Sequence, residues 1–521
     1  MKKEIVLSVK PEYIHDMAAI KVMAAQECGI TVDDISALTI QKRSIDARSK
    51  KIHYTIQTAV YIDEFPEAVQ PLRQQLQKKL HKHTVVIIGA GPCGYFAALE
   101  LLRHGIKPII LDRGKDVRSR RRDLRAIQQF GIVNPHSNYC FGEGGAGTYS
   151  DGKLYTSSKK RGDIRTVLRL LVEHGAHSDI LVDAHPHIGS NKLPNVVQNI
   201  RATICEYGGE VYFDSFVTDI ELRENNCIIK TLDGKEFIGN DCILATGHSA
   251  RDIFYLLNKK NIAIEAKPFA IGVRAEHPQE LIDDIQYHGY KRGEYLPASA
   301  YKLVTHVNER GVFSFCMCPG GLIVPAATAP EEIIVNGMSM SRRDSAFANS
   351  GIICAIAPEQ TLQFRDDGEF ACLNFQKFVE NNVWNMGTGT QQAPAQRLAD
   401  FVQGKLSNAL PKTSYIPGIF SAPIAQVFPT DITNSLQQAF KDFDKKMRGY
   451  LTNDAIVVAT ESRTSSPVKI PRDKESLAHI HFPNLYPAGE GAGYAGGIMS
   501  AALDGKSVAE KIAKKTGLFV M

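Results

Sequence analysis

Residues 1–80 carry hydrophobic patterns that predict a small βαββ module. The segment EIVLSV, from Glu4, predicts a strand, and PEYIHDMAAIKVMAAQECG predicts an amphipathic helix that ends at Gly29. The segments ISALTIQKRSIDA and KKIHYTIQTAVYI alternate between apolar and polar residues like two antiparallel strands. A helical pattern in PEAVQPLRQQLQKKLHKH then predicts a helix that links this module to Val85.

The next pattern, VVIIGAGPCGYFAALELLRHGIKPIILDRG, predicts a dinucleotide-binding βαβ unit. An apolar strand leads into Gly89-x-Gly91-x-x-Gly94, a helical pattern follows, and a second apolar run ends at Asp112. Such glycines let the turn tighten, the backbone approach a pyrophosphate and the helix pack on the strand. The helix N-terminus favours the phosphates, and Asp112 is placed to accept hydrogen bonds from an adenosine ribose. The residues expected at the cofactor are Gly89, Gly91, Pro92, Gly94, Asp112 and Arg113.

The remaining patterns predict an α/β domain interrupted by a mixed domain. KDVRSRRRDLR predicts a helix with a basic, solvated face, and residues 164–209 are helical except for DAHPHIGSNKLP. Strands with turns continue to Gly247, whereas residues 265–450 mix strand patterns with loops rich in Gly, Pro and Ser. The chain ends with a strand, a Gly-rich turn and a helix. We therefore expect an N-terminal module (1–80), a cofactor domain (83–265 and 450–521) and an inserted α+β substrate domain (266–449).

Composition narrows the classes of function. The chain has 521 residues and a net charge of only +5, which does not favour a protein that binds DNA through phosphate contacts. No apolar run approaches the roughly 18–20 residues of a membrane span. The ten cysteines form no framework, which is typical of free thiols in a reducing compartment. These features predict a cytoplasmic protein without a membrane span.

Two further motifs resemble those of the glutathione-reductase-like FAD fold. ILATG ends a strand at Thr246 and Gly247, and LYPAGEGAGYAGGIMSAALDG follows almost at the end of the chain. In that fold a late strand ends in Gly and an acid that binds the ribityl and pyrophosphate part of FAD. The corresponding residues here are Gly489 and Glu490, where Asp is more usual. The resemblance implies non-covalent FAD, with the helix that begins at Gly496, Gly497 and Ile498 facing the flavin pyrimidine edge.

Over nearly the whole chain, the motifs GEGGAGTYSDGKL, HPHIGSNKLP, FSFCMCPGG, VNGMSMSRRDSAFANSGI and ESRTSSPVKIPRD resemble the family of uncharacterised FAD-dependent dehydrogenases. More distantly, the chain is similar to geranylgeranyl-reductase-type flavoproteins. The resemblance implies that Glu143, Gly144, Gly145 and Ser150 lie along the FAD phosphates and the flavin ring. It also implies that Val217 contacts adenine through its backbone. It supplies a fold and a cofactor but no substrate.

Several residues are weaker candidates for catalysis. Cys316 and Cys318 could form a redox pair, although a C-x-C disulfide is strained and buried cysteine is often a packing residue. Arg463, and Arg342 with Arg343, could bind an anionic substrate, and structural ion pairs explain them equally well. Tyr494 could stack near the flavin or simply pack.

Four histidines, His174, His177, His185 and His187, could suggest a metal site, but no Cys or acid completes a ligand set. We therefore expect no metal, with structural or substrate-facing roles for these side chains; His187 is the one kept as a catalytic candidate.

The sequence thus predicts a FAD-dependent oxidoreductase that acts on a small molecule through hydride transfer at flavin N5. No further Gly-x-Gly-x-x-Gly sequence opens a separate nicotinamide domain, so NAD(P)H would act as a transient reductant or another donor protein would supply electrons. One alternative is a flavin-dependent RNA-modifying enzyme, against which the small net charge argues. It would use the basic residues Lys42, Arg43, Arg48, Lys50 and Lys51. The other alternative is a non-catalytic FAD-binding redox partner or sensor.

Overall fold

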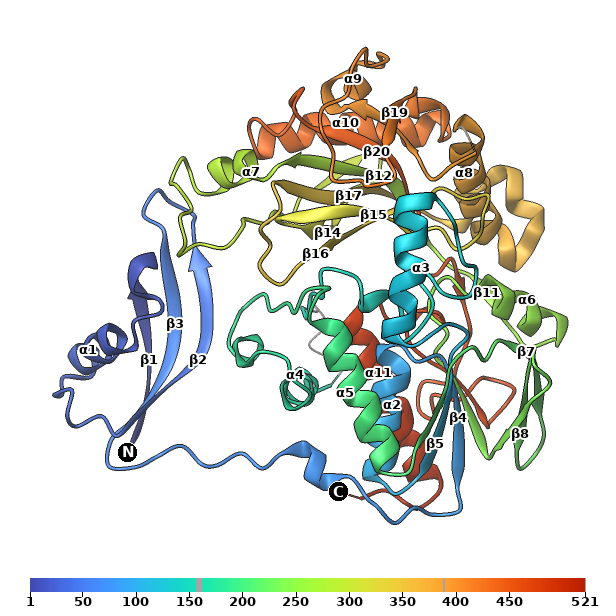
Figure 1. The fold of residues 1–521 in the computed structure, drawn as a ribbon, viewed down its shortest axis with the longest axis horizontal. Coiled ribbons are helices and arrows are strands. Elements are labelled where there is room, and N and C mark those ends of the chain that lie inside the picture. Colours follow the sequence, from blue (N-terminus) through green and yellow to red (C-terminus); the bar gives the residue numbers. More distant parts are fainter. Residues whose placement is uncertain (156–161, 388, 521) are drawn as a thin grey trace.

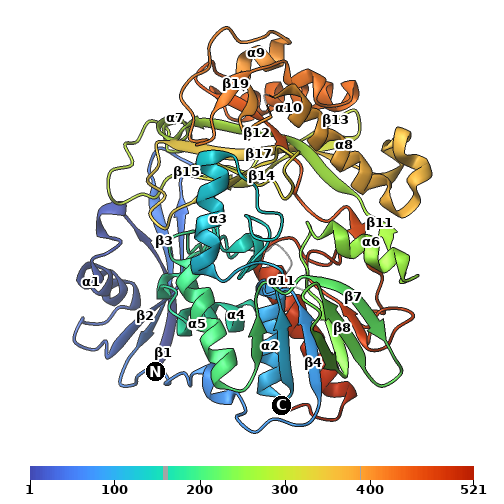
Figure 2. The same ribbon diagram turned by 45° about the vertical axis from the view of Figure 1, so that its right-hand side comes forward.

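The computed structural model describes residues 1–155, 162–387 and 389–520, which form three parts (Figure 1). A small N-terminal module, coloured blue, lies to one side of an α/β domain, and a second sheet with its helices lies above that domain. The turned view shows helix α3 (Val117–Phe130) rising from the α/β domain towards the upper sheet (Figure 2). Within the described ranges, no helix has both the length and the hydrophobicity to cross a bilayer.

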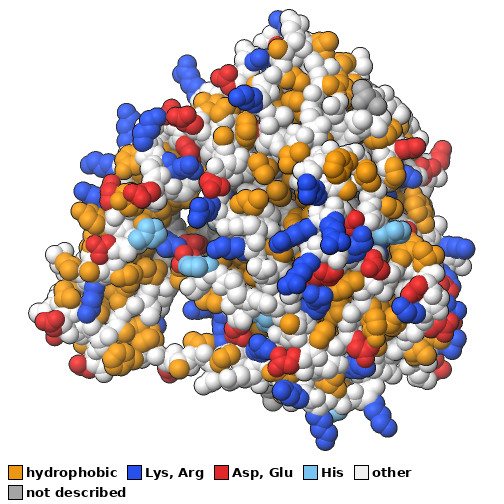
Figure 3. Space-filling model, in the orientation of Figure 1, with side chains coloured by type: hydrophobic (Ala, Val, Ile, Leu, Met, Phe, Trp, Pro, Cys, Tyr) orange, Lys and Arg blue, Asp and Glu red, His pale blue; other side chains and the backbone are white. Residues whose placement is uncertain are grey.

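The N-terminal module has the predicted βαββ order. Its elements are β1 (Lys2–Val9), α1 (Met17–Cys28), β2 (Ala37–Asp46) and β3 (His53–Tyr61), with β3 in the middle of an antiparallel sheet. The Asp16 carboxylate caps α1 by accepting a hydrogen bond from the Ala19 N–H (3.0 Å), and Gly29 ends the helix with φ 66°. Figure 3 shows an opening between the lower part of this module and the rest of the protein.

The predicted linker helix is wrong. Residues 66–83 contain only one short 3₁₀ turn, η2 (Leu72–Gln75). Pro71 precedes this turn, and a proline both lacks an N–H and pushes the residue before it out of the helical region. The backbone N–H groups of Leu72 and Arg73 instead donate to the Glu173 carboxylate (2.8 and 3.0 Å). The linker therefore follows the surface of the α/β domain, to which it is hydrogen-bonded.

The α/β domain is built on a five-stranded parallel sheet. The spatial order of its strands is β22 (Leu485–Pro487), β10 (Asp241–Leu244), β4 (Thr84–Ile88), β5 (Lys107–Leu111) and β6 (Glu210–Tyr212). One face is covered by α2 (Pro92–Arg103), α4 (Ile164–Glu173), α5 (Leu193–Glu206) and α11 (Ile498–Lys515). The other face packs against α6 (Arg251–Lys259) and the antiparallel sheet of β7 (Val217–Leu222), β8 (Cys227–Thr231) and β9 (Glu236–Gly239). The sequence therefore predicted the Rossmann-like parallel sheet correctly.

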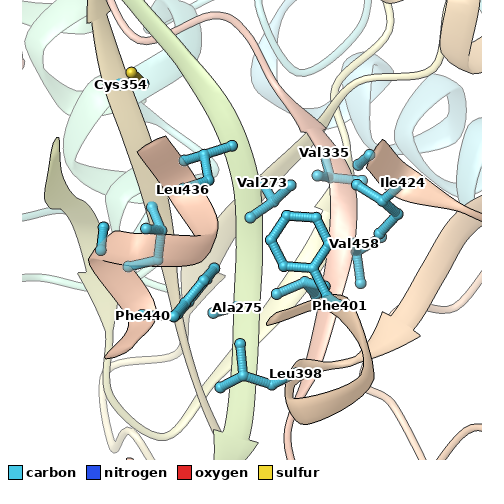
Figure 4. Close-up of a cluster of buried hydrophobic side chains, with 14 of the residues drawn as sticks. Val273, Ala275, Val335, Cys354, Leu398, Phe401, Ile424, Leu436, Phe440 and Val458 are labelled. Atoms are coloured by element: carbon cyan, nitrogen blue, oxygen red, sulfur yellow. The ribbon is translucent and has the colours of Figure 1, made fainter. Parts of the chain in front are cut away.

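The second sheet has seven strands, in the order β13 (Val304–Val307), β14 (Arg310–Cys318), β17 (Phe347–Ile356), β12 (Phe269–Pro278), β20 (Ile456–Glu461), β18 (Ala393–Arg397) and β19 (Ile419–Ser421). Helices α7 (Gln279–Gln286), α8 (Ala371–Met386), α9 (Leu398–Gln403) and α10 (Thr430–Lys446) complete it. Figure 4 shows its core, where Val273 and Val458 of the sheet face Phe401 of α9 and Leu436 and Phe440 of α10.

Strand β20 corrects the expected boundary at residue 450. It pairs with β12 and β18 in the second sheet, so the chain returns to the α/β domain only after Glu461. Its continuous apolar run resembles a parallel strand because both of its faces are buried. The two crossings between the domains lie together, since β11 (Glu265–Ala266) pairs with β21 (Val468–Lys469). A hairpin of β15 (Gly321–Pro325) and β16 (Val335–Ser339) packs against α3.

Candidate functional site

A cavity of about 350 Å³ lies where the two domains meet. The α/β domain contributes the turn after β4, the end of β10, residues 140–153 and the N-terminus of α11. The second sheet and its connections contribute Phe315, Cys316, Asn336, Arg463 and Thr464. The cavity is therefore bounded on one side by the predicted cofactor motifs and on the other by side chains of the inserted domain.

Glycines of the first motif are required by close packing. A Cβ atom on Gly94 would lie 2.0 Å from the Gly89 carbonyl oxygen, and one on Gly89 would lie 2.3 Å from the Ala245 carbonyl oxygen. Gly89 also has φ 113°, a conformation that favours glycine. These contacts bring helix α2 and strand β10 close to the turn, as the glycine spacing predicted.

Other glycines leave room on the cavity side. Gly91 and Gly145 face one another, and a Cβ atom on Gly145 would lie 3.3 Å from the Gly91 Cα atom. A Cβ on Gly247, Gly496 or Gly497 meets no atom of the described chain within 4 Å. All five line the cavity, so side chains at these positions would fill space that a bound dinucleotide needs. This cradle fits a cofactor whose pyrophosphate approaches the backbone.

The glycine-rich loop after α3 is held by Arg120, which the sequence analysis counted with a solvated basic face. Its guanidinium is fully buried and donates hydrogen bonds to the carbonyl oxygens of Asn138 (2.8 Å), Glu143 (2.8 Å) and Gly145 (2.9 Å). The loop is also joined to the first motif, because the Gly144 N–H donates to the Ala90 carbonyl (2.9 Å). Arg120 is thus a positioning residue for one wall of the cavity.

The two acids of the first unit have different surroundings. Asp112 lines the cavity, and its carboxylate accepts hydrogen bonds from the N–H groups of Ala90 (2.9 Å) and Gly114 (2.8 Å). It fixes the turn and retains acceptor capacity towards the cavity. Glu143, by contrast, is completely buried and is not a lining residue. Its carboxylate accepts from the Tyr95 hydroxyl (2.9 Å), the Val117 N–H (2.8 Å) and the Arg201 guanidinium (3.1 Å).

Arg113 lies at the same end of the cavity, between two aromatic rings. Its guanidinium carbon lies 4.3 Å from the centre of the Phe141 ring and 4.5 Å from that of Phe216. The group also forms an ion pair with Asp252 (2.6 Å). Val217, Thr246 and Ser150 line the cavity as well, whereas Gly144 and Gly489 are not lining residues. Pro92 and Ile498 line it at the first turns of α2 and α11.

Glu490 has the environment that points most directly to a ligand. It lines the cavity, and among the described residues none donates a hydrogen bond to its carboxylate. Burial raises the pKa of this carboxyl to about 7, although the positive charge of Lys267 opposes the shift. A partly buried acid without a donor is costly. Hydroxyl groups of a bound dinucleotide would supply the missing donors.

The weaker catalytic candidates separate into two groups. Cys316 and Arg463 line the cavity, whereas Cys318, His187 and Arg342 do not. The Arg463 guanidinium is paired with Glu380 (2.7 Å) and Glu332 (3.1 Å), and Arg251 binds the same two acids. Although burial acts to raise the pKa of Glu380, these two cations lower it to about 2. Arg463 is therefore chiefly part of a buried ion-pair network.

The remaining candidates have structural partners. His187 lies 3.1 Å through Nε2 from the Ser341 carbonyl oxygen, and burial lowers its pKa. His174 contacts the Leu170 carbonyl (2.6 Å) and the Thr203 hydroxyl (3.0 Å). Across the part of the chain that is described, no three His, Cys, Asp or Glu side chains gather as a metal site. The Tyr494 ring packs 3.7 Å beneath the Arg472 guanidinium, and it is not a lining residue.

Basic side chains lie mostly away from the cavity. In the N-terminal module, Arg43 pairs with Asp183 (2.7 Å) and Arg48 pairs with Asp46 (2.5 Å). Lys42, Lys50 and Lys51 are exposed. The largest gathering of Lys and Arg in Figure 3 lies over α3, whose exposed arginines are Arg118, Arg121, Arg122 and Arg125. Arg342 is exposed too, whereas Arg343 binds Asp151 (2.5 Å).

Comparison with known proteins identifies the cofactor. Residues 82–127 match an FAD binding domain, residues 268–464 match the family "FAD-dependent protein, C-terminal domain-like", and residues 1–61 match a domain of unknown function. The first match covers the Gly89 turn and Asp112, so the dinucleotide is FAD. A protein of Clostridium beijerinckii named "Uncharacterized protein" is 38% identical over 526 positions, which cover 96% of this chain and 97% of that protein.

Similarity to solved structures is low. The structure of CtdE in complex with FAD is 12% identical, with 84% of this chain and 87% of that chain covered and a TM-score of 0.31. Native FqzB is 10% identical, with 85% and 79% covered and a TM-score of 0.37. At this level of similarity neither protein indicates what this chain acts on.

Proposed function

We propose that this chain, a member of a family of uncharacterised FAD-dependent proteins, is a FAD-dependent oxidoreductase that acts on a small molecule. Its cofactor domain would have the glutathione-reductase-like form. The observation that carries the proposal is Glu490, a cavity-lining carboxylate for which the described chain provides no hydrogen-bond donor. It lies beside the open glycine positions and the N-terminus of α11.

The residues that would hold FAD form three groups, one for each part of the cofactor. The turn at Gly89 and Gly91 and the loop at Gly145 and Ser150 would bind the phosphates. Asp112, Arg113 and Val217 would bind the adenosine half. Glu490 and the N-terminal turn of α11 would bind the ribityl chain and the flavin. Gly497 is the N-cap of helix α11, and the free N–H groups of the first turn favour partial negative charge on a ligand.

Bound FAD supplies a carrier for a hydride at its N5 atom. The protein would orient the substrate against it and exclude water. Phe315, Cys316 and Asn336 form the wall opposite the cofactor motifs, so a substrate would approach from the inserted domain. The ion pairs of Arg251 and Arg463 with Glu332 and Glu380 would keep this wall rigid. A nicotinamide would visit as a transient reductant.

The experiment is to purify the protein and identify the cofactor that heat releases. We expect FAD, not FMN, and no flavin in the denatured pellet. The flavin should then be reduced without oxygen by NADH, NADPH or a substrate from a panel of unsaturated and hydroxylated metabolites. A colourless protein would contradict FAD binding. A flavin that reductants bleach but that supports no turnover with any substrate would favour a redox sensor.

Oxygen distinguishes the two reaction types that remain open. In a dehydrogenase, an organic acceptor would reoxidise the flavin, and the product would contain no oxygen atom from air. A monooxygenase would incorporate one atom of labelled dioxygen into the product. Mass spectrometry of the product formed under labelled oxygen separates the two, with substrate-free enzyme as the control for uncoupled peroxide formation.

A further inference from the structure

Strand β14 has a bulge where it meets the cavity. Its pairing with β17 runs regularly to Phe315 opposite Gly351 and resumes with Cys318 opposite Asn349, so Cys316 and Met317 lie opposite Ser350 alone. Cys316 has φ 45°, a left-handed conformation that residues other than glycine rarely adopt. Bulges and such conformations re-aim side chains beside active sites. The bulge here makes Cys316 a lining residue of the cavity.

A second thiol lies behind the first. Cys318 is fully buried, and its Sγ atom lies 3.2 Å from the carbonyl oxygen of Cys316. Both residues carry free thiols in this structure, and the Cys318 thiol donates its hydrogen bond to the Cys316 carbonyl oxygen. The half-buried member of the pair therefore lines the cavity, and the buried member lies behind it.

Charged groups surround the pair. The Arg274 guanidinium donates to the Cys316 carbonyl (2.9 Å) and lies 3.6 Å from the Cys318 sulfur. Its other partner is Glu461, at 2.8 Å. The Lys153 ammonium donates to the Met317 carbonyl from the opposite wall. Donors and cations favour the charged form of a thiol.

The acids that face the pair are Glu461, Glu490 and Asp151. Asp151 is neutralised by Arg343 and Glu461 by Arg274. The neighbouring Cys318 side chain is the main cause that lowers the pKa of Cys316, with Lys153 and Arg274 adding to it against burial. The same contact raises the pKa of Cys318. The surroundings therefore favour the thiolate form at Cys316 and the protonated form at Cys318.

We propose that Cys316 and Cys318 form a thiol–disulfide exchange site for small disulfides, with Cys316 as the attacking thiolate and Cys318 as the resolving thiol. The Cys316 thiolate attacks one sulfur of the disulfide, the bond between the two sulfurs breaks, and one thiolate leaves. Cys318 then loses its proton, attacks the Cys316 sulfur and releases the second thiol. The two cysteines are oxidised by two electrons, and the small disulfide is reduced to two thiols.

The exchange reaction itself needs only the two cysteines. A transfer of electrons between this pair and the flavin would also rest on the proposed function. A disulfide across a C-x-C sequence is strained, and strained disulfides are the readily reduced ones. Two equivalents of a small thiol would reduce such a bond again and leave as their own disulfide, so the bond suits a site that cycles rather than a permanent cross-link. None of the other cysteines of the described chain combines a place on the cavity wall with a second cysteine two positions away.

The test uses dithiodipyridine, a small disulfide that releases one coloured thiopyridone for each thiol that attacks it. The protein carries Cys205→Ser, because Cys205 is the exposed thiol of α5. We expect a fast release of two thiopyridones per chain, with mass spectrometry locating a disulfide between Cys316 and Cys318. Cys318→Ser should release one and retain a mixed disulfide on Cys316, and Cys316→Ser should lose the fast phase.

Two further arms make the result specific. Cys318→Ala removes the hydrogen-bond donor that Cys318→Ser retains, so alkylation of Cys316 by iodoacetamide at pH 7 should be at least tenfold slower in the alanine variant. Buried Cys354, whose pKa burial raises to about 11, should stay unmodified and reports that the fold is intact. A Cys316 that reacts no faster than Cys205 in the parent protein would overturn the proposal.

The FAD content is measured on the same samples, so the two proposals fail separately. A yellow protein with a slow Cys316 would remove the exchange site and leave the proposed function standing. A colourless protein with the fast two-step release would do the reverse.

Discussion

The Asp504 carboxylate of α11 accepts a hydrogen bond from the Gly489 N–H at 2.7 Å and binds the Arg472 guanidinium at 2.6 Å. Gly489 immediately precedes Glu490, so this contact joins the last helix to the strand end that presents the cavity carboxylate. The placement of Glu490 therefore depends on a residue that lies fourteen positions further along the chain and does not itself line the cavity.

The first prediction concerns Glu490 itself. If FAD hydroxyls are its hydrogen-bond donors, Glu490→Ala removes a charged hydrogen bond that contributes about 1.5–3 kcal/mol. FAD affinity should then fall by roughly ten- to a hundredfold. Glu490→Asp keeps the carboxylate and should cost much less. FAD is titrated into the FAD-free forms of the parent and the two variants, and flavin fluorescence gives the order of the three affinities. Equal affinities would mean that the carboxylate does not contact the cofactor.

Local sequence patterns predicted the parts of this site that local packing determines. Gly94 is required by a contact with Gly89 inside one βαβ unit, so the spacing of these glycines was sufficient to find it. The same spacing also found Gly89, although that residue packs against the distant Ala245. Arg120 also had a signal. It is three residues from Val117 and four from Leu124, and all three lie on the buried face of α3. The density of arginine around it concealed that periodicity.

Features that depend on pairing between distant segments could not be predicted in this way. The bulge at Cys316 exists because β14 and β17 differ in register, and nothing in FSFCMC fixes that register. The buried run of β20 gave the same pattern as a strand of the parallel sheet. Likewise, the amides of the linker bind Glu173, a residue about one hundred positions away, so a helical pattern there was misleading.

Asp504 provides the second prediction. Asp504→Ala leaves Arg472 without its carboxylate in a site where both side chains are nearly buried. Breaking a buried ion pair on one side costs about 3–5 kcal/mol. The thermal midpoint of the FAD-free protein should drop clearly, and FAD affinity should fall with it. Asp504→Asn can still accept from Gly489 and should lose less of both. If the alanine variant is as stable as the parent and binds FAD as tightly, the contacts of Asp504 with Gly489 and Arg472 do not position Glu490.

Arg120 should be essential for cofactor binding although it lies outside the cavity lining. Arg120→Met leaves the buried carbonyls of Asn138, Glu143 and Gly145 without their donor. Each unsatisfied buried group costs about 1–3 kcal/mol. We expect at least tenfold weaker FAD binding, with partial recovery in Arg120→Lys because one ammonium cannot span the guanidinium's contacts. Arg122→Met, on the exposed face of the same helix, is the matched control and should bind FAD normally.

The raised pKa of Glu490 predicts a dependence of stability on pH in the FAD-free protein. Burial raises this pKa from its ordinary value of 4.5 to about 7, so the folded protein holds a proton that the unfolded chain has lost between those values. Stability should therefore fall as pH rises from 4.5 to 7 and change little above it. Glu461, whose pKa burial also raises to about 7, adds a slope of the same sign.

Glu490→Gln isolates the contribution of Glu490. The variant should show a smaller decline in thermal midpoint across this range, and the difference from the parent protein should grow between pH 4.5 and 7. FAD should bind the parent more tightly as pH rises through 7, since the ionised carboxylate accepts hydroxyl hydrogen bonds best, whereas the glutamine variant should show no such rise. If the thermal midpoints of the parent and the glutamine variant depend on pH in the same way, Glu490 is not the group with the raised pKa.

The last prediction separates the N-terminal module from its linker. Residues 1–61 do not line the cavity. They contact the rest of the chain through polar bonds, such as the Arg43–Asp183 pair and the hydrogen bond from the Tyr54 hydroxyl to the Tyr295 carbonyl (2.7 Å), and through Tyr287 and Leu296, which pack into the core of the module. The linker instead packs on the α/β domain, because Leu76 is buried in the core of that domain and Leu72 and Leu80 pack against it.

A chain that begins at residue 62 should therefore fold and retain a full complement of FAD, since none of the proposed cofactor residues has been removed. A chain that begins at residue 81 also loses the two amides that bind Glu173 and the buried leucine, which contributes about 1.5–3 kcal/mol. Its thermal midpoint should be lower, and Leu76→Ala in the full chain should reproduce part of that loss. The ratio of FAD to protein and the thermal midpoint are measured for all three. If the chain from residue 62 is soluble but colourless, the module is an integral part of the cofactor domain and the linker is not the boundary between them.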